Sequence, residues 1–274
     1  ISFNKWDTTN KNPVGQIEHI IGPVGNIENE TNALLYKNYM CFKGKSQQKK
    51  TQYLLSDDEI SKHSWINHLN PDEFEYETIS IDPPGCLDID DAFHVKQLDD
   101  STIEVGIHIA DVASRLNLEQ LQSKFKCFTS IYFDGGKQEN MLNDDFTYNI
   151  ASLGNGELKR AVSLIIKFKT DFTANTAQID SFAFKSTIVK NVALNYSEAD
   201  NYIKRKSNHL TETPTQTSLK LLNKLAKILM NIEAEHDFPA TKMVEHFMLM
   251  YNSLCAETLF AYNKQTILRS HKKT

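Results

Sequence analysis

The sequence predicts an α+β protein in which a mixed β-sheet comes first and helices that pack on it follow. Apolar and polar residues alternate along residues 102–109, as is typical of a strand with one buried face. From residue 197 onward, apolar residues instead recur every three or four positions, as is typical of amphipathic helices. With 274 residues, 40% hydrophobic and 24% charged, the chain has the composition of an ordinary globular protein.

The first 75 residues predict two different kinds of structure. Residues 1–50 contain short apolar patches, such as 33–36, between turn-forming residues, and this pattern predicts short strands and loops. Residues 51–75 are predicted to form a linker with a helix. There, Ser56 and Glu59 have capping-box spacing ahead of an apolar-periodic stretch.

The strands of the sheet and the later helices follow from the same periodicities. Strands are predicted at residues 78–81, 92–95, 102–109, 161–168 and 178–190. The polar residues 99–101 and 170–176 are predicted turns. Two apolar stripes, one over 221–232 and one over 243–254, predict helices whose apolar faces form core.

The feature most indicative of function is a group of four aspartates within ten residues: Asp82, Asp88, Asp90 and Asp91. Residues 83–85, Pro-Pro-Gly, exclude a helix there, so the backbone is predicted to be a loop between two strands. Carboxylates held this close repel one another and raise one another's pKa values unless a cation neutralises them. Carboxylate ligands without His or Cys select Mg²⁺ or Mn²⁺, and such a site suits phosphodiester hydrolysis by a metal-activated water.

Two other interpretations apply to an acidic segment of this kind. A solvated acidic loop without a function is the common alternative, but the flanking strands at 78–81 and 93–95 are predicted to be buried, which argues against it. An EF-hand loop beginning at Asp88 fits poorly, because Ala92 and Phe93 stand where that loop needs a ligand and a glycine.

The spacing Asp-x5-Asp-x-Asp-Asp resembles the signature of the RNase II (RNB) family of 3′ to 5′ exoribonucleases. The variant Ser-Ile-Asp-Pro-Pro-Gly-Cys at residues 80–86 is most similar to the eukaryotic exosome-type catalytic subunit. Further segments resemble the family in the same order along the chain: 105–112, 129–132, 151–153, 160–163, 222–226 and 245–249.

The resemblance also implies a division of the chain into domains. Residues 1–50 are similar to the C-terminal part of a cold-shock or OB-like β-barrel domain. Residues 51–75 would be the linker helix, and residues 76–274 the N-terminal portion of an RNB catalytic domain, truncated before its end.

Roles for individual residues are implied as well. In the family, Asp82, Asp88 and Asp91 would hold metal ions, and Asp90 would act in catalysis by positioning metal and attacking water. Tyr132 would stack on the 3′-terminal nucleotides of the RNA, unless it is simply a half-buried tyrosine that ends a strand. Arg160 would reach a phosphate, or it would pair with an internal carboxylate. His108 and Asp111 are interpreted as structural.

Taken together, the resemblance implies a Mg²⁺-dependent exoribonuclease that converts single-stranded RNA to nucleoside 5′-monophosphates, with Mn²⁺ as the alternative to Mg²⁺. It further implies exosome-like subunits as partners, no membrane, and an intracellular location in the nucleus, the cytoplasm or both. The net charge of −5 gives no global indication of nucleic-acid binding, so any RNA contact must be local.

Departures from the family pattern leave an alternative open. Cys127-Phe128 stands in place of Arg-Gly and Glu245-His246 in place of a Glu pair, and the sequence stops before the segment Thr-Ser-Pro-x-Arg-Arg-Tyr. That segment supplies an arginine that clamps the phosphate. The alternative is therefore a non-catalytic RNA-binding or assembly module, a truncated or decayed relative. A small-molecule phosphohydrolase would leave the ordered match along the chain unexplained.

Overall fold

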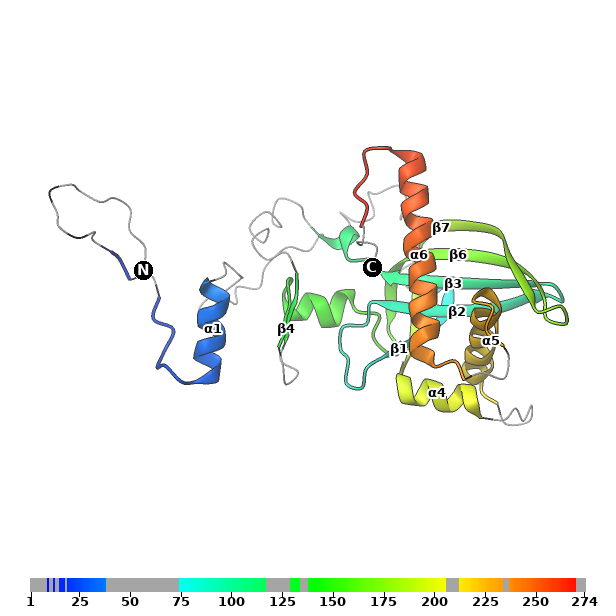
Figure 1. The fold of residues 1–274 in the computed structure, drawn as a ribbon, viewed down its shortest axis with the longest axis horizontal. Coiled ribbons are helices and arrows are strands. Elements are labelled where there is room, and N and C mark those ends of the chain that lie inside the picture. The colour runs from blue at the N-terminus through cyan, green and yellow to red at the C-terminus, as the bar shows by residue number, and fades with distance from the viewer. Residues whose placement is uncertain are drawn as a thin grey trace. The chain divides into compact units, whose positions relative to one another are not determined.

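The computed structural model describes residues 9, 12, 15–17, 19–37, 74–116, 129–133, 138–205, 212–233 and 237–269 (Figure 1). The chain divides into two compact units. A smaller unit comprises residues 1–54 and 117–143, and a larger unit comprises residues 55–116 and 144–274. The linker helix predicted within residues 51–75 lies outside the described residues.

In the smaller unit, helix α1 (Ile27–Lys37) replaces the short strand predicted at residues 33–36, so that prediction was wrong. The side chain of Asn26 starts the helix, because its Oδ1 accepts hydrogen bonds from the backbone N–H groups of Glu28 at 3.0 Å and Asn29 at 3.2 Å. Acidic residues in the first turn and Lys37 in the last turn complement the helix dipole. These helix-end signals outweigh the local β-propensity.

The smaller unit also contains a two-stranded antiparallel sheet. Strand β4 (Ile131–Tyr132) pairs with β5 (Gln138–Glu139). The side-chain hydroxyl of Ser130 accepts a hydrogen bond from the backbone N–H of Met141 at 3.2 Å, which ties the two ends of this hairpin together.

The larger unit is built on a closed five-stranded barrel in the order β1-β2-β3-β6-β7. Its strands are β1 (Tyr76–Asp82), β2 (Asp91–Asp99), β3 (Thr102–Ala110), β6 (Leu158–Asp171) and β7 (Thr176–Asn195). Four neighbouring pairs are antiparallel, and β1 pairs in parallel with β7 to close the barrel. All five predicted strands are present, and the prediction of a mixed sheet is confirmed.

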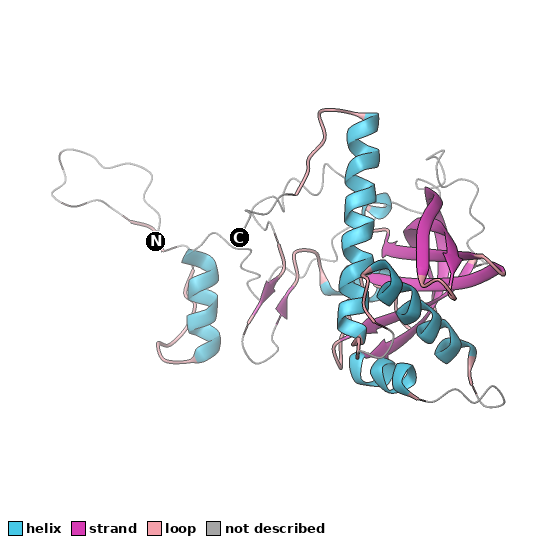
Figure 2. Ribbon diagram, turned by 45° about the vertical axis from the view of Figure 1, so that its right-hand side comes forward, coloured by secondary structure: helices cyan, strands magenta, loops and turns pink. Residues whose placement is uncertain are grey.

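Three helices follow the barrel strands, and Figure 2 shows them gathered against one side of the barrel. They are α4 (Tyr196–Lys204), α5 (Pro214–Leu229) and α6 (Ala240–Tyr262). Capping boxes begin the first two, at Asn195 with Glu198 and at Thr213 with Gln216. No helix in the described part of the chain is long and apolar enough to cross a membrane.

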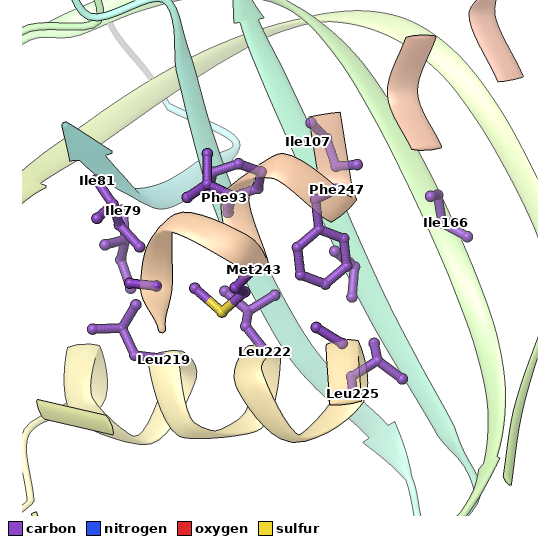
Figure 3. Close-up of a cluster of buried hydrophobic side chains, with 14 of the residues drawn as sticks. Ile79, Ile81, Phe93, Ile107, Ile166, Leu219, Leu222, Leu225, Met243 and Phe247 are labelled. Carbon is purple, nitrogen blue, oxygen red and sulfur yellow. The ribbon is translucent and has the colours of Figure 1, made fainter. Parts of the chain in front are cut away.

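The main core lies between the outer face of the barrel and these helices. Phe93 of β2 and Ile107 of β3 point toward α6, where Phe247 packs against Phe93 with ring centroids 5.9 Å apart (Figure 3). Leu222 of α5 and Met243 of α6 complete the contact. The alternating face of residues 102–109 and the helical stripes therefore bury one another, as their periodicities predicted.

The opposite strand face, which points into the barrel, carries a chain of polar side chains. His94 Nδ1 lies 2.7 Å from His108 Nε2, His108 Nδ1 lies 2.7 Å from Ser163 Oγ, and Ser163 Oγ lies 2.7 Å from Thr187 Oγ1. The prediction that His108 lies opposite the isoleucine face is confirmed. Gly106 leaves space for the imidazole of His94 in this row of polar side chains, because a Cβ at residue 106 would lie 2.2 Å from His94 Nδ1.

We predict that the buried His94 makes stability fall in acid. Burial holds the pKa of His94 well below its usual value, so the folded state keeps this imidazole neutral while the unfolded chain takes up a proton. As pH drops below about 6.5, the contribution of His94 should therefore decline by up to about 1.4 kcal/mol per pH unit.

The measurement is the free energy of unfolding in urea at several pH values, for the wild type and for His94→Gln. The difference between the two proteins isolates the histidine from the aspartates, whose raised pKa values act in the opposite direction. A difference that stays constant between pH 7 and 5 would contradict the prediction.

Candidate active site

The acidic segment forms a tight loop between β1 and β2, as predicted. The backbone N–H of Cys86 donates to the carbonyl of Pro83 at 3.1 Å and closes a four-residue turn. Gly85 has φ +80°, a left-handed conformation that glycine adopts without strain and that follows a proline in type II turns. The Pro-Pro-Gly sequence therefore reverses the chain within a few residues of the end of β1.

This loop brings the four aspartates of the predicted site to one end of the barrel. Asp82 is the last residue of β1 and Asp91 is the first residue of β2, while Asp88 and Asp90 lie in the loop between them. The backbone carbonyl of Asp90 accepts a hydrogen bond from the N–H of Ala110 at 2.9 Å, which ties the loop to the end of β3.

The pKa values of all four carboxyls are raised. Burial is the largest cause in each case. With further repulsion from Asp90 and Asp82, the pKa of Asp88 rises to about 6. Burial and repulsion from Asp82 and Asp90 raise the pKa of Asp91 to about 7. Asp90 is exposed as a residue, yet the atoms around its carboxyl desolvate it enough to raise its pKa. The pKa values of Asp88 and Asp91 thus depend on the charges of Asp82 and Asp90.

Ser152 holds the acidic loop in place through two hydrogen bonds. Its hydroxyl donates to the carbonyl of Leu87 at 2.9 Å and accepts from the N–H of Ile89 at 3.0 Å, so it bridges the two residues that flank Asp88. The next residue, Leu153, donates its N–H to the carbonyl of Ile89 at 2.9 Å. Ser152 is only 1% exposed, and its hydrogen bond with the N–H of Ile89 is buried away from water.

A pocket of about 230 Å³ lies beside the loop, between Asp82, Cys86 and the end of β7 at residues 193–195. Tyr196 follows directly, and its pKa is raised by burial and by the nearby charges of Asp82 and Asp91. We did not predict Tyr196 as part of the site. Nothing in the sequence indicates its position, because only the parallel pairing of β1 with β7 brings it to the aspartates.

The aspartates fit a divalent metal ion in their chemistry. One oxygen of Asp82, Oδ2, is buried and has no hydrogen-bond partner, and such an oxygen is costly unless a cation or a donor reaches it. Mutual repulsion within an all-oxygen donor set is relieved by a hard cation. Within the described residues, no three His, Cys, Asp or Glu side chains already converge on one point where a metal ion could be held.

The two predicted RNA-contact residues lie in different units. Tyr132 belongs to the hairpin of the smaller unit, where its side chain is 72% exposed. Arg160 lies on β6 of the larger unit, and its backbone carbonyl accepts a hydrogen bond from the N–H of Asp111 at 3.1 Å. Within the larger unit, the barrel therefore links Arg160 to the end of β3, next to the strand that begins with Asp91.

Comparison with known proteins identifies the family. The RNB domain matches residues 72–274. This chain belongs to the RNB family. Residues 1–39 also match the Dis3-like cold-shock domain 2 (CSD2). The RNB match spans the whole barrel, the acidic loop and the three helices.

A curated relative agrees with the assignment of this chain to the RNB family. The chain is 30% identical over 305 residues to the exosome complex exonuclease RRP44 homolog A of Arabidopsis thaliana, and the alignment covers 99% of this chain and 32% of the relative. The chain therefore spans about a third of the length of this curated relative.

Solved structures share the fold of this RNB chain. RNase R of Mycoplasma genitalium in complex with double-stranded RNA matches with a TM-score of 0.71 and 19% identity, over 96% of this chain and 50% of the other. Yeast Ssd1, described as a pseudonuclease, matches with a TM-score of 0.63 and 16% identity, over 95% and 35% of the two chains.

We predict that Ser152→Ala loosens the acidic loop. The variant removes two hydrogen bonds and leaves the buried N–H of Ile89 and the partly buried carbonyl of Leu87 without their partner, so the free energy of unfolding should fall by about 1–3 kcal/mol. Urea denaturation measures the change. Ser186→Ala is the matched control, because Ser186 is equally buried and its Oγ has no hydrogen-bond partner. Equal losses in the two variants would contradict the anchoring role.

Proposed function

We propose that this chain carries the metal-binding part of a 3′ to 5′ exoribonuclease that hydrolyses single-stranded RNA to nucleoside 5′-monophosphates. The observation that supports this most is the loop from Asp82 to Asp91, anchored by Ser152, with four carboxyls whose pKa values are all raised. A chain that performs no chemistry gains nothing from holding repelling carboxyls together, since the repulsion destabilises the fold.

In this proposal Asp82, Asp88 and Asp91 hold Mg²⁺, with Mn²⁺ as an alternative, and Asp90 is the catalytic residue. Bound divalent ions would supply an activated water and stabilise charge at the scissile phosphate. The contribution of the chain itself is to fix the carboxyls. The turn at residues 83–86, the hydrogen bonds of Ser152 and the pairing of β1 with β7 all restrict the loop.

RNA contacts are proposed for Tyr132 and Arg160. The exposed ring of Tyr132 offers a face on which a base can stack without regard to sequence. The guanidinium of Arg160 matches the geometry of a phosphate. Because the Arabidopsis relative is an exosome complex exonuclease by name, we extend the proposal to exosome-like subunits as partners and to the nucleus, the cytoplasm or both as the location.

A second candidate function is RNA binding without turnover. The same fold occurs in yeast Ssd1, which is described as a pseudonuclease. Under this alternative the barrel would keep its RNA contacts while the carboxyls performed no hydrolysis. The four aspartates favour the enzyme, and the following experiment separates the two functions.

We predict that the chain, given Mg²⁺ and 5′-labelled single-stranded RNA, shortens the RNA progressively, and that Asp90→Asn slows this by at least about a hundredfold. Denaturing gels follow the shortening, and chromatography identifies the released nucleotides. Asp180→Asn, a change of the same chemistry on an exposed part of β7, should leave the rate unchanged. Retention of RNA by the wild type without shortening would instead support the binding module.

We also predict direct metal binding. Mn²⁺ added to the metal-free chain should bind, as measured by electron paramagnetic resonance of the free ion. Asp88→Asn and Asp91→Asn should each weaken this binding by about tenfold or more, because each removes a charged ligand. The Asp180→Asn variant is again the control. Unchanged Mn²⁺ affinity in both loop variants would exclude these two carboxyls as ligands.

A further inference from the structure

Asn191 lies where the parallel seam of the barrel, the pairing of β1 with β7, meets the segment that holds the acidic loop. On β7 it is in register with Thr78 of β1. Its backbone carbonyl accepts a hydrogen bond from the N–H of Gly156 at 2.8 Å. The residue is only 1% exposed. At Asn191, β7 is therefore joined both to the strand that ends with Asp82 and to the residues that follow Ser152.

The side-chain amide of Asn191 makes three hydrogen bonds, and these fix its orientation. Its Nδ2 lies 2.7 Å from the carbonyl oxygen of Leu153 and 3.0 Å from Ser80 Oγ. A carbonyl oxygen only accepts hydrogen bonds, so the atom that faces Leu153 must be the amide nitrogen. The amide oxygen, Oδ1, accepts from the hydroxyl of Thr78 at 3.1 Å. Both ends of the amide are thus engaged with fixed partners.

This orientation decides how the hydroxyl of Ser80 is used. An amide nitrogen only donates, so Ser80 Oγ is the acceptor in its hydrogen bond with Asn191, and its own hydrogen remains for another acceptor. Ser80 is buried on β1, two residues before Asp82, and its side chain is hydrogen-bonded with the Asp82 carboxyl. Burial raises the pKa of Asp82, and this hydrogen bond opposes the rise, as expected where a hydroxyl donates to a carboxylate.

A buried asparagine can also serve the fold alone, and Asn223 of α5 is an example in the same unit. It is 4% exposed, and its Nδ2 donates to the carbonyl of Phe238 at 2.9 Å, which joins α5 to the segment before α6. Asn191 differs, because both groups to which its amide donates are bonded in turn to the acidic segment. One is the serine hydroxyl described above. The other belongs to Leu153, whose N–H donates to the carbonyl of Ile89 at 2.9 Å.

We propose that Asn191 is a positioning residue for the metal site: its amide holds Ser80 as a hydrogen-bond donor to Asp82 and so fixes the carboxylate that β1 contributes. The metal role of Asp82 rests on the proposed function, whereas the direction of the hydrogen bonds follows from the amide itself. Asp82 Oδ2, which is buried and has no hydrogen-bond partner, remains for a cation. Groups that orient a metal ligand in this way contribute to metal affinity without touching the ion.

The test is a double-mutant cycle on the Mn²⁺ affinity of the full chain, measured by electron paramagnetic resonance of the free ion. Ser80→Ala should weaken Mn²⁺ binding about tenfold and Asn191→Ala about fivefold. If Asn191 acts through Ser80, the double variant should lose no more than about tenfold, whereas independent contributions would multiply to about fiftyfold. Asn223→Ala is the matched control. It should lower the urea midpoint of unfolding, as Asn191→Ala does, yet leave Mn²⁺ affinity unchanged.

Two results of this cycle would overturn the proposal. One is a wild-type Mn²⁺ affinity in Asn191→Ala, which would leave Asn191 with the same purely structural role as Asn223. The other is a double variant whose loss equals the product of the two single losses. Ser80→Ala removes a single buried oxygen and decides the matter if Asn191→Ala does not fold, because an unchanged Mn²⁺ affinity in Ser80→Ala would exclude the route through Ser80.

A metal-free measurement separates this proposal from the proposed function. In a chain labelled with ¹³C at its aspartate carboxyls, the nuclear magnetic resonance signal of Asp82 is assigned by its loss in Asp82→Asn. In EDTA, this signal should shift in Ser80→Ala and in Asn191→Ala but not in Asn223→Ala. A wild-type chain that binds no Mn²⁺ would defeat the proposed function, while these shifts would still support the positioning role. An Asp82 signal that stays in place in Asn191→Ala would overturn that role even where Mn²⁺ binds.

Discussion

The parallel pairing of β1 with β7 is the constraint on which the rest of the larger unit depends. It closes the barrel, and its register places Asp82 opposite Asn195, the residue that caps α4. The buried side chain of Asn191 stabilises this seam, with hydrogen bonds from its amide to Ser80 Oγ at 3.0 Å and to the carbonyl of Leu153 at 2.7 Å. The acidic loop and the start of the helices therefore meet at one end of the barrel.

Folding of the acidic loop costs electrostatic free energy. Burial and mutual repulsion raise the pKa values of Asp88 and Asp91, so keeping these carboxyls ionised in the folded protein costs free energy. The cost is offset by anchors with no charge: the turn at Gly85, the two hydrogen bonds of Ser152 and the buried Leu153. Strain of this kind, held by the surrounding structure, is common where proteins bind metal or substrate.

The outer and inner faces of the barrel strands carry different kinds of side chain. The apolar residues of β2 and β3 point outward and are covered by α5 and α6, while the inner face carries the chain from His94 to Thr187. Five strands leave room for few side chains inside, and the hydrogen bonds from His94 Nδ1 to Thr187 Oγ1 each join two neighbouring strands. Gly106 is essential to this arrangement, because any side chain there would overlap the imidazole of His94.

The sequence by itself determined the strands of the barrel, the helices that cover it and the acidic loop, because periodicity and turn residues act locally. The Pro-Pro-Gly sequence within the acidic segment reverses the chain, so the sequence already predicted that its four aspartates lie close together. Only the tertiary structure decided what depends on contacts between distant residues: the closure of β1 on β7, the hydroxyl of Ser152 beneath the loop, the position of Tyr196, and the amide of Asn191 between Ser80 and Leu153. The helix at residues 27–37 shows the same limit at short range, since there a side-chain cap and charged helix ends outweighed the apolar pattern that predicted a strand.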